Sequence, residues 1–232
     1  MFRKLSLYAA SIALLALTSN ALADRIAVIG TGNVAGALGP EFAALGHDII
    51  YGSRDPLRDD VKELLARTGD KASATTPAES VVGADIVVLA VPGGLAESIT
   101  KSLGDLSGKI IIDPTNNYSR EGVPHLVGDI SNGELIQAAA PGAHVVKAFN
   151  TLNWRQMVDP ESSGGPISIA LAGNNAEAKK IVAELVAGMG LEPVDVGPIR
   201  NARHVEGMLV LWAHGRVNGT PFNYHLRKVP PQ

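Results

Sequence analysis

The sequence predicts an α/β fold built on a doubly wound parallel sheet, and two observations support this. Short apolar segments alternate along the chain with segments of helical periodicity, as they do in sheets whose strands are joined by helices. The first apolar segment, residues 26–29, enters the turn Gly30-x-Gly32-x-x-Ala35, and a helical pattern follows it. This order of strand, turn and helix is typical of dinucleotide-binding turns, so we expect a Rossmann-like domain.

Residues 1–23 have the pattern of a secretory signal peptide and are expected to precede the folded domain. Arg3 and Lys4 form a basic segment, residues 5–17 are apolar, and residues 21–23 have the small side chains of a cleavage site. We expect cleavage after Ala23 and a periplasmic or secreted protein. The alternative is an uncleaved N-terminal membrane anchor. An exported domain would have to carry a dinucleotide out already bound, or use a different ligand.

Composition excludes several classes of partner and site. The chain has 232 residues and a net charge of −3, which becomes more negative if Arg3 and Lys4 are removed. No basic cluster is present, which argues against nucleic acid and against anionic membrane surfaces as partners. The sequence contains no cysteine, which excludes a disulfide framework and a lipoprotein anchor. Its histidines lack the spacing of a zinc site, so we expect no metal.

The glycine-rich turn predicts a phosphate site. Gly30 permits the tight turn off the strand, and Gly32, which has no Cβ atom, lets the backbone approach a pyrophosphate. Ala35 lets the following helix pack closely on the strand. The free N–H groups at the start of that helix then face the phosphates. The alternative reading is an ordinary strand-to-helix turn.

The second strand predicts which dinucleotide binds. We expect this strand at residues 47–51, ending at Gly52-Ser53-Arg54. In a dinucleotide-binding fold this point meets the adenosine ribose, where an arginine accommodates the 2′-phosphate of NADP. Ser53 can donate a hydrogen bond to that phosphate, and Arg54 can make charge-assisted contacts with it. NADP is therefore favoured over NAD, although Asp55 would oppose a phosphate and Arg54 could be a solvated turn residue.

The next strands predict the other wall of the site. Segments 85–92 and 109–114 are nearly all apolar, which indicates strands buried on both faces of a parallel sheet. Ligands of such sheets bind beyond the carboxyl ends of the strands. Pro92, Asn116 and Asn150 follow such ends and are candidates for the wall around a nicotinamide. The remaining elements expected up to this point are a third strand at 71–75, a sixth at 144–149, and helices at 61–67, 95–103 and 134–140.

After Trp154 the pattern predicts a small C-terminal α/β lobe or an extension of the same sheet. We expect strands at 166–173 and 193–197, a helix between them capped by Asn174 or Asn175, and a final helix over 199–214. The predicted division is a cofactor domain at 24–151 and a lobe at 152–232 that closes the cleft. Arg203 and Glu206 are expected to form a structural helix-face pair of small energetic value on the final helix.

Several motifs together carry a resemblance to a known family. They are Gly30-Thr-Gly-Asn-Val-Ala35, Gly52-Ser-Arg54, Ala90-Val-Pro92, Val146-Lys-Ala-Phe-Asn-Thr151 and Val194-Asp-Val-Gly-Pro-Ile-Arg-Asn-Ala-Arg203. In this order the sequence resembles the coenzyme F420-dependent NADP oxidoreductases, and it is similar to the reductase domain of the STEAP metalloreductases. The resemblance implies NADP(H) held by Thr31, Asn33, Val34, Ser53 and Arg54, with the nicotinamide near Ala90, Val91, Pro92 and Asn150.

The resemblance also implies direct hydride transfer from NADPH to a flavin-like or deazaflavin (F420-type) co-substrate. Transfer between two stacked rings needs positioning and exclusion of water more than an acid or a base, so no catalytic residue is assigned. The alternatives are an NADP(H)-binding or sensor protein without turnover, and a reductase of a small imine or carbonyl substrate. The expected partner is a small-molecule electron acceptor, and relatives suggest a homodimer.

Overall fold

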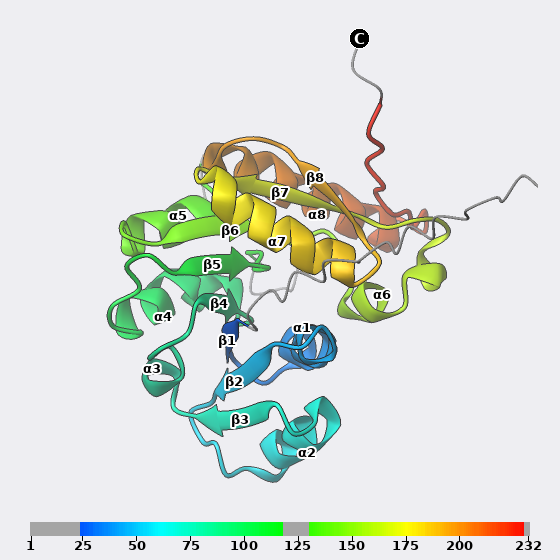
Figure 1. Ribbon diagram of the computed structural model, residues 1–232. Helices are drawn as coiled ribbons and strands as arrows, with labels where there is room; N and C mark the ends of the chain where they lie inside the picture. The colour runs from blue at the N-terminus through cyan, green and yellow to red at the C-terminus, as the bar shows by residue number, and fades with distance from the viewer. Residues whose placement is uncertain (1–23, 118–129, 230–232) are drawn as a thin grey trace, which may run out of the picture.

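The computed structural model describes residues 24–117 and 130–229, and its centre is an eight-stranded sheet (Figure 1). The strand order is β3-β2-β1-β4-β5-β6-β7-β8. The strands are β1 Arg25–Ile29, β2 Asp48–Gly52, β3 Ala72–Thr75, β4 Ile86–Leu89, β5 Ile110–Asp113, β6 His144–Lys147, β7 Ser168–Gly173 and β8 Glu192–Asp195. The helices are α1 Asn33–Ala44, α2 Asp59–Thr68, α3 Pro77–Ser80, α4 Ala96–Ser102, α5 Asn132–Ala139, α6 Trp154–Val158, α7 Ala176–Gly188 and α8 Ala202–Val217. Three short 3-10 helices are η1 Gly93–Leu95, η2 Pro160–Ser163 and η3 Ile199–Asn201.

Helices cover the sheet on both faces, and the alternation of side chains along each strand builds two cores. On β1, Ile26 and Val28 enter one core with apolar residues of α1, α2, α6 and α7. Their neighbours Ala27 and Ile29 enter the other core with residues of α4, α5 and α8. All four side chains are buried, as expected for strands of a parallel sheet with both faces covered. The predicted Rossmann-like, doubly wound fold is confirmed.

The C-terminal strands continue the same sheet, which was the second of the two predicted arrangements. Strand β7 pairs with β6 in antiparallel orientation, and β8 pairs with β7 in parallel orientation. Figure 1 shows β7 and β8 at one end of the sheet and β3 with α2 at the other. Pro193 lies in β8, at the edge of the sheet. The division of the chain into domains after residue 151 stays a prediction.

Two short helices were missing from the sequence prediction, and the final helix is shifted. Helix α3 begins with a capping box between Thr76 and Glu79, a signal that the sequence carried. Helix α6 begins at the side-chain cap of Asn153. Residues 199–201 form the 3-10 turn η3, so α8 begins at Ala202. The predicted signal peptide lies outside the described residues. Within residues 24–117 and 130–229, no helix has the length and apolar character needed to cross a membrane.

Candidate nucleotide-binding site

The glycine-rich turn has the geometry that an anion site requires. Gly30 has a φ of +104°, and a Cβ atom there would lie 2.3 Å from the carbonyl oxygen of Ala90. Gly32 is the N-cap residue of α1 and makes no side-chain cap, so the first N–H groups of the helix have no capping side chain. A Cβ atom at Gly32 would meet nothing within 4 Å, so this backbone faces open space. Unpaired N–H groups at an open helix N-terminus form a ready site for phosphate.

A cavity of about 570 Å³ lies over this turn at the carboxyl ends of β1, β2 and β4. Its volume is in the usual range for small-molecule and cofactor sites. The predicted residues that line it are Gly30, Thr31, Gly32, Ser53, Arg54, Ala90, Val91 and Pro92. The other lining residues include Arg58, Leu95, Ser98, Ile99 and Ser102. The structure therefore brings the glycine turn, the Ser53-Arg54 pair and the end of β4 together around one cavity.

Three predicted site residues are not among the residues that line this cavity. Asn33 is exposed at the first turn of α1, and Val34 packs half-buried against the core. Asn150 is 2% exposed, and its side-chain amide donates to Asn116 Oδ1 at 3.0 Å and to the carbonyl of Val205 at 3.3 Å. Their contact with a cofactor stays a prediction. The hydrogen bond from Asn150 to Asn116 joins the segment that follows β6 to the segment that follows β5.

Two arginines line the end of the cavity at β2. Arg54 is exposed and forms no salt bridge within the described part of the chain. Arg58 donates through Nε and Nη2 to the carboxylate of Asp60, at 2.8 Å each, and through Nη2 to Thr31 Oγ1 at 3.3 Å. Ser53 is buried, and its hydroxyl donates to the carbonyl of Asp55 at 2.9 Å. Arg54 thus has an uncommitted charge, while the charge of Arg58 is shared with a carboxylate.

Arg58 is a site residue that the sequence analysis missed, because its contact with Thr31 appears only in the folded arrangement. It occupies the N-cap position of α2. A cation is unfavourable near the positive end of a helix dipole, and the paired contact of Arg58 with Asp60 in the first turn of α2 offsets that effect.

The described residues that line the cavity offer hydroxyls, guanidinium groups and backbone, and no carboxylate, imidazole or amine. The described lining side chains therefore include none of the residue types that commonly serve as a general acid or base. The described residues also contain no group of three or more metal-ligating side chains. Such a lining can bind and orient a ligand and exclude water from its apolar end.

A buried ionic cluster lies beyond this cavity, at the ends of β5 and β6. The ammonium of Lys147 is 3.0 Å from Asp113 Oδ2 and 2.7 Å from Glu206 Oε1. Burial raises the pKa of the Glu206 carboxyl, and the adjacent Lys147 ammonium opposes that rise in pKa. The predicted helix-face pair of small energetic value is wrong for Glu206, because this carboxylate is only 3% exposed and pairs with Lys147. Arg203 instead forms an ion pair with Glu134 at 2.5 Å.

Comparison with known proteins identifies the family to which this chain belongs. The family described as "NADP oxidoreductase coenzyme F420-dependent" matches residues 25–117. The crystal structure of a candidate F420-dependent NADP reductase from Arthrobacter sp. FB24 is 34% identical, with a TM-score of 0.80, and the match covers 88% of this chain and 100% of that one.

Two curated relatives extend this comparison. The F420-dependent NADP reductase of Methanothermobacter marburgensis is 27% identical over 201 residues, which are 78% of this chain and 88% of the relative. Metalloreductase STEAP3 of Rattus norvegicus is 29% identical over 187 residues, which are 80% of this chain. The match spans 36% of the length of that metalloreductase.

Proposed function

Because this chain belongs to the family of coenzyme F420-dependent NADP oxidoreductases, we propose that it binds NADP(H) and transfers hydride between NADPH and a flavin-like or deazaflavin acceptor. The observation that carries the proposal is one cavity lined both by an uncapped helix N-terminus and by two arginines. These groups match the two anionic parts of NADP, its pyrophosphate and its 2′-phosphate.

The adenosine end of the cavity favours NADP over NAD. Arg54 and Arg58 lie at the end of β2, where the ribose of a bound dinucleotide is expected. Guanidinium groups bind phosphate through paired, charge-assisted hydrogen bonds. The segment after β2 also carries carboxylates, and Asp60 is already paired with Arg58. Arg54 is therefore the residue on which we expect the preference to depend most.

The opposite end of the cavity suits the nicotinamide. Ala90, Val91 and Pro92 follow β4, and Leu95 and Ile99 add apolar side chains to the same lining. An apolar wall excludes water, which protects a hydride donor from side reactions. Bound NADPH would supply the hydride. The role of this chain is to orient the nicotinamide ring and to exclude water from it.

The lining also bears on the choice of acceptor. Hydride added to a carbonyl or a neutral imine places negative charge on one oxygen or nitrogen, which needs a proton from an acid, and the described lining residues provide none. A flavin-like or deazaflavin ring also takes up one proton with the hydride, but the reduced ring spreads the negative charge, so water can supply that proton and the cavity has only to position the two rings. We therefore prefer a ring acceptor. A protein that binds NADP(H) without turnover is the second candidate.

The test is oxidation of NADPH by the purified full chain with F420, FMN or riboflavin as acceptor. We expect the absorbance of NADPH to fall with at least one of these acceptors. When NADH replaces NADPH as the donor, the absorbance should fall much more slowly. Tight NADPH binding with no oxidation by any acceptor would support the non-catalytic alternative. Failure to bind either nucleotide would overturn the proposal.

We also propose export and self-association, both from the sequence. The pattern of residues 1–23 supports a cleaved signal, with an N-terminal membrane anchor as the alternative. Fractionation of expressing cells, followed by N-terminal sequencing, should find a chain that begins at Asp24 outside the cytoplasm. Light scattering of the purified protein would test the homodimer.

A further inference from the structure

The buried cluster of Lys147, Asp113 and Glu206, called the Lys147 cluster below, joins two strands to a helix. Asp113 and Lys147 end the neighbouring strands β5 and β6 and are paired in register. Their side chains are fully buried, and that of Glu206 on α8 is 2% exposed. The third N–H of the ammonium donates to the carbonyl of Thr115. The ammonium has three donors, and each has an acceptor in the protein.

Glu206 also fixes the start of α5. Its Oε2 atom accepts a hydrogen bond from the N–H of Asn132 at 3.1 Å, and its Oε1 atom accepts one from the N–H of Gly133 at 3.4 Å. A carboxylate is favoured at this position because the N-terminus of a helix carries positive partial charge. The Lys147 cluster therefore holds β5, β6, α5 and α8 in one arrangement.

Two residues connect the Lys147 cluster to the wall of the cavity. Thr115 Oγ1 donates to Asp113 Oδ1 at 2.7 Å and accepts from Asn132 Nδ2 at 2.8 Å. Asn132 Nδ2 also donates to the carbonyl of Gly93 at 3.2 Å. Gly93 follows Pro92, a lining residue of the cavity, and a Cβ atom at Gly93 would lie 1.9 Å from the carbonyl oxygen of Asn116. The backbone after β4 is thus held between Asn116 and Asn132.

A strained residue, Phe149, lies two positions after Lys147 in the chain. Phe149 is buried and has a φ of +62°, a left-handed conformation that bulky side chains rarely adopt. Such strain persists only where the surroundings fix it, and it gathers at functional sites. Phe42 packs against its ring in an edge-on arrangement, at 6.3 Å between centroids. On the following residue, Asn116 Nδ2 donates to the carbonyl of Asn150 at 2.8 Å.

We propose that the Lys147 cluster positions the wall of the nicotinamide subsite, acting through Thr115 and Asn132 on Pro92 and Gly93. The inference rests on the proposed function, because the wall has this role only if NADP(H) occupies the cavity. Lys147 is not among the residues that line the cavity, so it is a positioning residue and not a catalytic one. Burying two carboxylates and an ammonium is unfavourable compared with an apolar core, and a need for fixed geometry is one reason to retain such a group.

The test removes the link and leaves the buried charges in place. Thr115→Val deletes the hydroxyl that joins Asp113 to Asn132, and Thr115→Ser retains it. The control is Thr68→Val on α2, because Thr68 also joins two partners, Tyr51 Oη and the carbonyl of Leu64, at 2.8 Å each. Thr68 is not among the residues that line the cavity.

The first readout is hydrogen–deuterium exchange of the free protein, which needs no ligand and no activity. We expect the amides of Val91 and of residues 93–95 to exchange faster in Thr115→Val than in the unmodified protein. Thr115→Ser and Thr68→Val should leave exchange in this segment unchanged. Equal exchange in Thr115→Val and Thr68→Val would overturn the proposal.

The second readout separates binding from turnover with NADPH and F420 or FMN. We expect kcat to fall about tenfold or more in Thr115→Val, because small displacements of bound reactants reduce rates strongly. The Kd for NADPH should change by less than about twofold, since the phosphate contacts are untouched, and Thr115→Ser should restore kcat. An unchanged kcat in Thr115→Val would overturn the proposal. If the unmodified protein does not oxidise NADPH, the proposed function fails, while the exchange measurement still decides whether the cluster orders this wall.

Discussion

The Nη2 atom of Arg58 donates a hydrogen bond to Oγ1 of Thr31 over 3.3 Å, which joins the segment after β2 to the glycine-rich turn. The same guanidinium is held by Asp60, and the hydrogen bonds from Arg58 lower the pKa of the Asp60 carboxyl. Arg58 is therefore fixed at the edge of the cavity, whereas Arg54 is free to close on a ligand. The two arginines should contribute unequally to binding.

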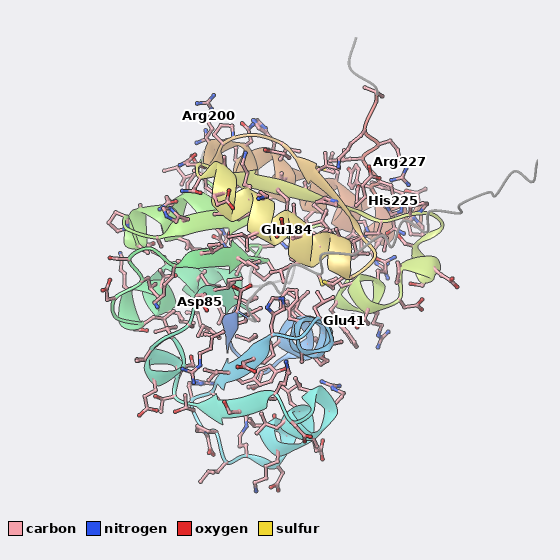
Figure 2. The ribbon with its side chains drawn as sticks, in the orientation of Figure 1. Glu41, Asp85, Glu184, Arg200, His225 and Arg227 are labelled. Carbon is pink, nitrogen blue, oxygen red and sulfur yellow. The ribbon has the colours of Figure 1, made fainter. Side chains whose placement is uncertain are left out.

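Loss of Arg54 should remove the preference for NADPH. We expect Arg54→Ala to raise the Kd for NADPH about tenfold or more and to leave the weaker binding of NADH nearly unchanged, because a hydrogen bond to a charged group contributes about 1.5–3 kcal/mol. Arg58→Ala should have a smaller effect, since Asp60 already shares its charge. Titration with each nucleotide measures both. Arg200→Ala is the matched control, because Figure 2 shows this side chain projecting from the end of the molecule near β7. Equal losses for NADPH and NADH would contradict a 2′-phosphate contact.

A methyl group at Gly32 should block the cofactor without unfolding the protein. The Cβ atom of Gly32→Ala would point into open space and meet no protein atom within 4 Å. We expect the midpoint of thermal unfolding to change little and binding of NADPH to fall markedly, because the added methyl keeps the pyrophosphate away from the helix N-terminus. Calorimetry measures the midpoint of unfolding, and titration of the same preparation with NADPH measures binding.

The control for that experiment is Gly207→Ala on α8, where a Cβ atom also meets nothing within 4 Å. It should leave NADPH binding unchanged and raise the free energy of unfolding by about 0.5–1 kcal/mol, as expected for alanine in place of glycine within a helix. Unchanged binding in Gly32→Ala would count against phosphate recognition by this turn.

Removal of the Lys147 ammonium should destabilise the fold strongly. Lys147→Met leaves the carboxylates of Asp113 and Glu206 buried without their cation, and breaking one partner of a buried ion pair lowers the free energy of unfolding by about 3–5 kcal/mol. Urea denaturation would measure the loss. Lys62→Met breaks the exposed pair with Asp59 and should change the free energy of unfolding by no more than about 0.5 kcal/mol. A loss as small as that of Lys62→Met would show that the buried carboxylates do not need the ammonium.

The stability of the protein should depend on pH through Glu206. Burial raises the pKa of this carboxyl above its ordinary value of 4.5, against the opposing effect of Lys147, and Asp113 raises the pKa further. The folded state then holds the proton more tightly than the unfolded state. The contribution of Glu206 to the free energy of unfolding therefore falls as pH rises from about 4.5 through the raised pKa.

Unfolding in urea at several pH values, compared between the unmodified protein and Glu206→Gln, isolates this contribution. The difference in the free energy of unfolding between these two proteins should change as pH rises from about 4.5 through the raised pKa of Glu206. For Glu177→Gln, at an exposed position on α7, the free energy of unfolding should vary with pH as it does in the unmodified protein. Parallel curves for Glu206→Gln would show that the carboxyl keeps its ordinary pKa.

The fold was predictable because its signals are local. The apolar strands, the glycines at 30 and 32 and the cap at Asn175 each depend on neighbours in the sequence, and each appears in the structure. The residues around the cavity followed from the rule that ligands bind at the carboxyl ends of parallel strands. Short helices such as α6, with few residues to carry a period, were missed.

The role of Glu206 could not be predicted, because it depends on which side of α8 faces the sheet. Apolar and small residues occur all around that helix, so periodicity does not identify the buried side. The partners of Glu206 come from β6 and from the start of α5, and only the folded arrangement brings them together. Arg58 was missed for a different reason, since its meaning depends on Thr31 across the cavity.

Pro193 has a consequence for how copies of this chain can meet. The N–H of Val196 donates to the carbonyl of Leu171 in β7, and the N–H of Glu192 donates to the carbonyl of Ile167 just before β7, so the nitrogen of Pro193 points away from the sheet. An approaching strand would meet a nitrogen that carries no hydrogen, beside the carboxylates of Glu192 and Asp195. Such edges discourage strand addition and the fibrous aggregation that can follow from it. Strand pairing between molecules is therefore disfavoured at β8, whereas the opposite edge strand, β3, contains no proline.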